Sequence, residues 1–77
     1  MTKKQIERLK NWFCVQVRMN QDNPEKITAA IKYLDDLLNA MFFTYFIEDY
    51  QEIGKIRKEI IGAGMEEYKK IQEEKIA

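Results

Sequence analysis

The side chains in this sequence with the most obvious capacity for chemistry are three pairs of adjacent carboxylates. Paired carboxylates can act as general acid and base or hold a metal ion, but helical sites of this kind usually add histidine and converge inside a bundle. The sequence contains no histidine, which also excludes a Ser-His-Asp triad and every His-ligated metal site. We therefore expect no enzymatic activity, no metal and no cofactor. The pairs are Asp35 and Asp36, Glu66 and Glu67, and Glu73 and Glu74.

The single cysteine, Cys14, is a second candidate for chemistry. A thiol becomes reactive when a helix N-terminus or basic neighbours lower its pKa. The helical pattern places Cys14 in the middle of a helix, with Lys10 and Arg18 one turn away on either side. We interpret Cys14 as a small, half-buried side chain. One cysteine alone forms neither an intrachain disulfide nor a cysteine zinc site.

Phosphate binding by basic residues near the N-terminus is a third possibility. Residues 1–22 carry five basic and two acidic side chains, although the whole chain has thirteen of each and a formal charge of zero. Phosphate contacts dominate nucleic-acid affinity, but a nucleic-acid binder usually shows a concentrated basic stripe and a recognition element. We therefore place nucleic acid below protein as a partner. Such a site would use Lys3, Lys4, Arg8 and Arg18.

An aromatic cluster over residues 42–50 is the strongest indication of a binding surface, because it holds five of the nine aromatic residues in the chain. Phe42 continues the apolar stripe of the preceding helix, whereas Phe43, Phe46 and Ile47 fall on its polar side. Exposed apolar patches normally mark an interface. Either a partner covers these side chains, or another part of the same chain does, and the sequence leaves both alternatives open. The predicted partner-interface residues are Trp12, Phe43, Phe46, Ile47 and Tyr50.

Helices must position these side chains, since apolar residues recur at spacings of three and four along the chain. Thr2 and Gln5 form a capping-box pattern, and Trp12 lies at the edge of the apolar stripe that follows. Asn23 and Pro24 are a preferred cap and first helical residue. The third helix is expected to continue through the Gly-Ala-Gly segment, because the apolar register carries across it. The predicted helices cover residues 3–19, 24–47 and 50–74.

The predicted fold is all-α, a single domain over residues 1–77 that forms a three-helix antiparallel bundle. Its second and third helices form a long hairpin that the shorter first helix leaves partly uncovered, so we expect a dimer. The start of the chain lacks the apolar segment of a signal peptide. Its longest apolar stretch is far shorter than a membrane span. We therefore expect a cytoplasmic protein.

The predicted function is that of a small non-enzymatic helical protein-interaction module, acting as a regulator, an adaptor or an assembly subunit. Self-association is expected, because a chain of 77 residues has a small core and no disulfide or metal to reinforce it. Two alternatives remain at this point. One is a nucleic-acid-associated regulator that uses the basic face of the first helix. The other is a purely structural oligomer subunit with no separate partner.

Overall fold

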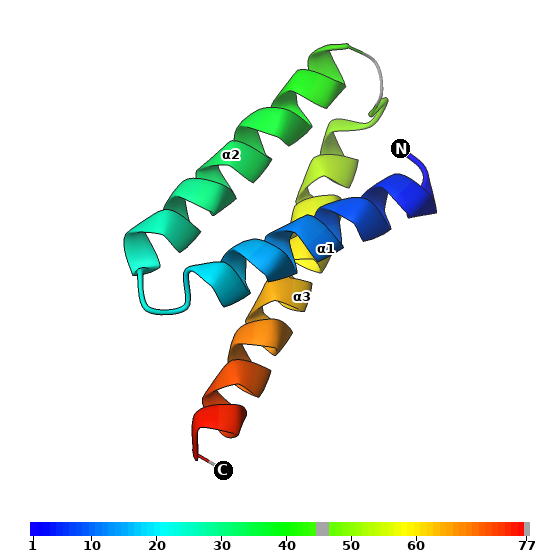
Figure 1. Ribbon diagram of the computed structural model, residues 1–77. Helices are drawn as coiled ribbons and strands as arrows, with labels where there is room; N and C mark the ends of the chain where they lie inside the picture. Colours follow the sequence, from blue (N-terminus) through cyan, green and yellow to red (C-terminus); the bar gives the residue numbers. More distant parts are fainter. Residues whose placement is uncertain (45–46, 77) are drawn as a thin grey trace.

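The computed structural model describes residues 1–44 and 47–76, and these form three helices: α1 (Lys3–Met19), α2 (Pro24–Phe43) and α3 (Tyr50–Ile76). In Figure 1, α1 and α2 form an antiparallel pair, and α3 crosses behind α1. The described residues contain no β-strand. The predicted all-helical, three-helix fold is confirmed.

The first two helices begin where their capping signals predict. The Thr2 hydroxyl accepts a hydrogen bond from the Gln5 N–H at 3.2 Å, and the Gln5 side chain accepts one from the Thr2 N–H at 2.9 Å. The Asn23 side chain accepts a hydrogen bond from the Lys26 N–H, and Pro24 follows it as the first helical residue. These bonds satisfy backbone N–H groups that have no partner inside the helix.

The second helix, α2, ends at Phe43, before the predicted boundary at residue 47. The hydroxyl of Thr44 donates to the Ala40 carbonyl at 2.9 Å, and the Thr44 N–H donates to the same carbonyl at 3.1 Å. The Ile47 N–H then donates to the Met41 carbonyl at 3.3 Å. The polar cap therefore ends the helix, and the chain folds back so that Ile47 enters the core.

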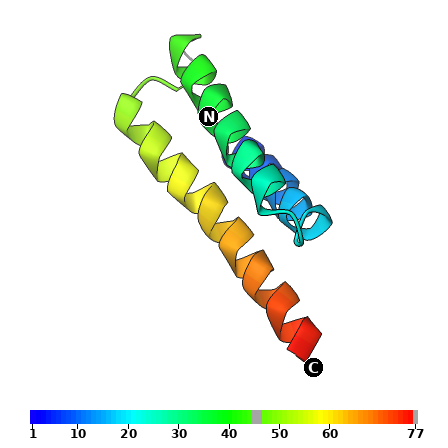
Figure 2. The same ribbon diagram turned by 90° about the vertical axis from the view of Figure 1, so that its left-hand side faces the viewer.

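The third helix, α3, is continuous through Gly62, Ala63 and Gly64, as predicted. Its first turn begins after Asp49, whose side chain accepts a hydrogen bond from the Gln51 N–H at 2.9 Å. With 27 residues it is the longest helix. Figure 2 shows its C-terminal end extending past α1 and α2.

The core lies where the three helices meet and consists entirely of apolar side chains among the described residues. The predicted hairpin of α2 and α3 is present, but the closest packing joins α1 to α3. The buried residues are Phe13, Val17, Ala30, Leu34, Leu38, Ile47, Ile53, Ile56, Ile60, Gly64 and Ile71.

The close approach of α1 and α3 depends on Gly64. A Cβ atom at this position would overlap the buried ring of Phe13, so the missing side chain provides the space that the ring occupies. The two neighbouring contacts, Cys14 to Ala63 and Arg18 to Glu67, each join residues 49 positions apart. A constant separation means that α1 and α3 run in the same direction, as expected for an up-down-up bundle.

Candidate interaction surfaces

The exposed aromatic residues predicted at the end of α2 form a cluster with Phe42, which we call the aromatic corner (Phe42, Phe43 and Tyr50). The Phe43 side chain is 77% exposed and Tyr50 is 65% exposed. The ring centroid of Phe42 lies 5.7 Å from that of Phe43 and 5.3 Å from that of Tyr50, both edge to face. Edge-to-face contact is a favoured arrangement of aromatic rings. Within the corner, the rings of Phe43 and Tyr50 are exposed to solvent.

The aromatic corner does not include Ile47, which is only 1% exposed. Of the two alternatives that the sequence left open, burial within the same chain therefore holds for Ile47. The helical pattern placed it on the polar side because the pattern assumed a continuing helix, whereas α2 ends at Phe43 and Ile47 lies in the core. Phe46, the neighbouring predicted residue, lies outside the described residues.

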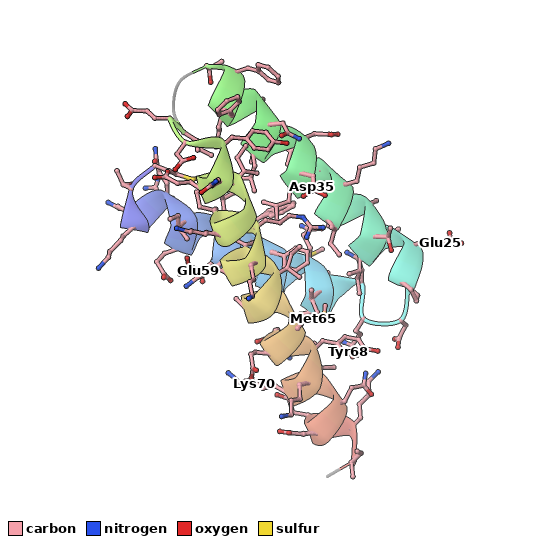
Figure 3. The ribbon with its side chains drawn as sticks, turned by 180° about the vertical axis from the view of Figure 1, so that it is seen from behind. Glu25, Asp35, Glu59, Met65, Tyr68 and Lys70 are labelled. Carbon is pink, nitrogen blue, oxygen red and sulfur yellow. The ribbon has the colours of Figure 1, made fainter. Side chains whose placement is uncertain are left out.

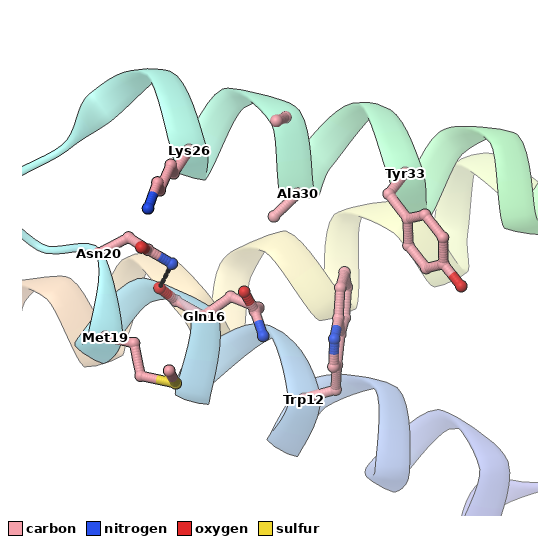
Figure 4. A pocket seen from close by; sticks show the side chains of 8 residues that line it. Trp12, Gln16, Met19, Asn20, Lys26, Ala30 and Tyr33 are labelled. Atoms are coloured by element: carbon pink, nitrogen blue, oxygen red, sulfur yellow. Dashed lines mark hydrogen bonds between the residues drawn. The ribbon is translucent and has the colours of Figure 1, made fainter.

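Trp12 belongs to a separate surface, the groove between α1 and α2 on the face away from α3 (Figure 4). The groove has a volume of about 510 Å³. The centroids of the Trp12 and Tyr33 rings lie 5.5 Å apart at one end of the groove, and Lys26 lies at the other. Trp12 also packs against the core, in agreement with its predicted place at the edge of the apolar stripe.

A third exposed apolar surface, on α3, was not anticipated from the sequence. Met65 is 48% exposed, and Tyr68 is also exposed. With Ile27 and Thr28 of α2 they line a groove of about 240 Å³. Figure 3 shows Met65 and Tyr68 on the same edge of α3, toward the loop between α1 and α2. Ile61, Met65 and Tyr68 are separated by four and three residues, which is the helical spacing that could have revealed this surface.

The basic residues of the nucleic-acid alternative do not form one free surface. Arg18 Nη2 lies 2.6 Å from a carboxylate oxygen of Glu67, and its Nη1 lies 3.5 Å from Glu74. Hydrogen bonds to Glu67 and then to Glu74 raise the pKa of Arg18. Arg18 therefore connects α1 to α3. The remaining predicted residues are exposed on the first half of α1: Lys3, Lys4 and Arg8.

The adjacent carboxylates are used largely in ion pairs between helices. Asp35 pairs with Arg57 at 2.5 Å, and Glu67 and Glu74 both pair with Arg18, so one member of each pair is engaged. Within the two described stretches, no three potential metal ligands lie together. The engaged carboxylates therefore pair with arginines at the surface of the bundle, Glu67 and Glu74 with Arg18 and Asp35 with Arg57.

The Cys14 thiol is half-buried and donates a hydrogen bond to the Ala63 carbonyl at 3.5 Å. Burial raises the pKa of this thiol, and the negative charge of Glu67 raises it further. A raised pKa leaves less thiolate at a given pH, so we expect iodoacetamide to alkylate Cys14 more slowly at pH 8 in the folded chain than in urea. Mass spectrometry over time measures both rates. Equal rates would show that the folded chain does not protect the thiol.

The fold and these surfaces define a small all-helical protein whose exposed apolar side chains lie along helix faces and in open grooves. The chain matches no known protein family, no curated protein and no solved structure. Over residues 1–44 and 47–76, none of the helices combines the length and the apolar character that a lipid bilayer requires of a spanning segment.

Proposed function

We propose that this chain is a small non-enzymatic protein-interaction module that associates with itself. The observation that carries the proposal is the amount of exposed surface. The folded chain exposes 5742 Å², whereas a compact monomer of 9.3 kDa exposes about 5,000 Å². The excess of roughly 750 Å² is close to the ~800 Å² that each partner contributes to an interface of standard size.

The shape of the chain supports the same proposal. Its radius of gyration is 13.3 Å, compared with about 11.5 Å for a compact domain of this length. The overall extents of 45 × 23 × 17 Å describe an elongated body. An elongated helical chain has a high ratio of surface to core, and association with a second copy reduces that ratio.

The exposed apolar side chains indicate where contacts are made. Phe43 and Tyr50 of the aromatic corner, and Met65 and Tyr68 of α3, are large apolar or aromatic side chains that the chain covers only in part. Aromatic residues and methionine are enriched at protein interfaces. These side chains supply contact area for another protein surface, as a regulator, an adaptor or an assembly subunit requires.

Sedimentation equilibrium from micromolar to millimolar concentration tests the proposal. We expect the average mass to rise with concentration from that of one chain, 9.3 kDa, toward at least twice that value. Because the exposed contacts are mainly apolar, the rise should persist at high salt. A mass of one chain at every concentration would overturn the proposal.

A further inference from the structure

The groove between α1 and α2 has an apolar middle with larger side chains around it. The small side chain of Ala30 lies between its two ends, and Ala29 lines it as well. The Trp12 and Tyr33 rings stand at one end with their centroids 5.5 Å apart, and Tyr33 is 59% exposed. Further along α1, Met19 is 73% exposed. A groove of this kind between two helices can receive the apolar face of a third helix.

The charged side chains at this groove are cations, one toward each end. Lys26 lies at the end away from Trp12. Arg8 precedes Trp12 by four residues, which places it one turn further along the same side of α1. Both cations are exposed, and neither takes part in the ion pairs of the described residues. The groove therefore has two cations available to a partner.

The acids of α1 and α2 lie away from these two cations. The one acid of α1, Glu7, pairs with Lys10 at 3.2 Å. On α2, the acid nearest to Lys26 by helical angle is Asp36, about 80° around the helix. Among the described residues that line the groove, none is acidic. The charge of the groove is therefore complementary to an acidic partner.

We infer that this groove binds an amphipathic helix of another protein, with acidic residues at both ends of its apolar stripe. Asn20, which lines the same end of the groove as Lys26, follows Arg8 by twelve residues, or about 18 Å of helix. In a partner helix, residues eleven positions apart share a face and lie about 16 Å apart. Two acids at that spacing match Lys26 and Arg8, and the apolar residues between them contact Trp12 and Met19.

The side chains of the groove favour a helix over a nucleic acid or a small molecule. Nucleic-acid binders usually show a concentrated basic stripe, whereas these cations stand at separate ends of an apolar stretch. A small-molecule pocket encloses most of its ligand, whereas this groove is open along its length (Figure 4). Tryptophan is a frequent anchor at interfaces, and the flanking charges set the register of the bound helix. The site is separate from the aromatic corner and does not depend on self-association.

Trp12 is the only tryptophan in the chain, so its fluorescence reports directly on the groove. The probe is a synthetic helical peptide without aromatic residues. Its contact face has glutamate at the first and twelfth positions and leucine at the fifth and eighth, and a control peptide has lysine in place of both glutamates. At low micromolar chain concentration, we expect the acidic peptide to shift the emission to shorter wavelength and to saturate. The lysine peptide should bind at least about tenfold more weakly.

Charge reversal in the groove tests the two cations. Lys26→Glu combined with Arg8→Glu should weaken binding of the acidic peptide by about tenfold and strengthen binding of the lysine peptide. The matched control is Lys55→Glu combined with Lys58→Glu, which makes the same change of charge at exposed residues of α3. This control should leave both affinities unchanged within about twofold. Circular dichroism checks that both variants remain helical.

The outcomes distinguish the possible occupants of the groove. Equal binding of the two peptides, or no saturable change at millimolar peptide, would overturn the inference. A single-stranded oligonucleotide that changes Trp12 fluorescence at lower concentration than the acidic peptide would assign the groove to nucleic acid instead. The same emission shift on concentrating the chain alone would assign it to a second copy. Sedimentation without peptide tests the proposed self-association separately, so either proposal can fail while the other holds.

Discussion

Replacing Gly64 by alanine is expected to lower the free energy of unfolding by about 2–3 kcal/mol. The added methyl group would occupy space that the ring of Phe13 fills, and Phe13 is fully buried between α1 and α3. The ring cannot move without disturbing the closest helix pair in the protein. A domain of this size has a total stability of only about 4–12 kcal/mol, so the loss is large. Urea unfolding followed by circular dichroism, at one low concentration, measures it.

Two variants control this prediction. Gly62→Ala adds the same methyl group two residues away in open space, and should raise stability by about 0.5–1 kcal/mol through helix propensity. Phe13→Leu removes the ring, so the cost of Gly64→Ala should fall when both changes are combined. A double-mutant cycle without such coupling, or a Gly64→Ala variant as stable as the parent chain, would contradict the packing described for this pair.

Replacing Ile47 by alanine is expected to lower the free energy of unfolding by about 2–4 kcal/mol, whereas Phe43→Ala should change it by less than about 0.5 kcal/mol. The two residues belong to the same aromatic-rich segment of the sequence. In the structure, however, Ile47 is buried in the core and Phe43 projects into solvent. Urea unfolding of both variants, at a concentration where the chain is monomeric, measures the difference.

Phe43→Ala should also weaken self-association, because it removes an aromatic side chain that is 77% exposed. A Phe43→Ala variant that unfolds would place Phe43 in the core. An Ile47→Ala variant of unchanged stability would show that the Ile47 side chain does not pack in the core.

The start of each helix could be predicted from the sequence because its cause is local. Thr2, Asn23 and Asp49 each cap a helix through a hydrogen bond to a backbone N–H two or three residues away. Pro24 adds a second local signal. These contacts need no knowledge of the other helices. The end of α2 was placed too far along the chain, because the apolar pattern continues past Thr44, whose hydrogen bonds to the Ala40 carbonyl end the helix.

Exposure was harder to predict than helix position, because it depends on which helix covers which face. The side chains of Tyr68 and Ile71 lie on adjoining parts of α3, and both fit the apolar pattern. The structure buries Ile71 and leaves Tyr68 on the surface, since α1 and α2 approach α3 from particular directions. Helical periodicity alone gives the angle between two side chains but not the position of the neighbouring helix. The exposed apolar surface of Met65 and Tyr68 on α3 was missed for this reason.

The parallel arrangement of α1 and α3 also has a consequence for how the chain folds. Its tightest contact joins residues about 49 positions apart, so the chain must close a loop containing all of α2 before Phe13 meets Gly64. Closing such a loop costs about 3 kcal/mol of chain entropy, which only the completed core repays. The antiparallel neighbours α1 and α2 form a much shorter loop and meet first. We therefore expect the folding rate to depend on the arrival of α3, because contacts between residues far apart in the sequence slow folding.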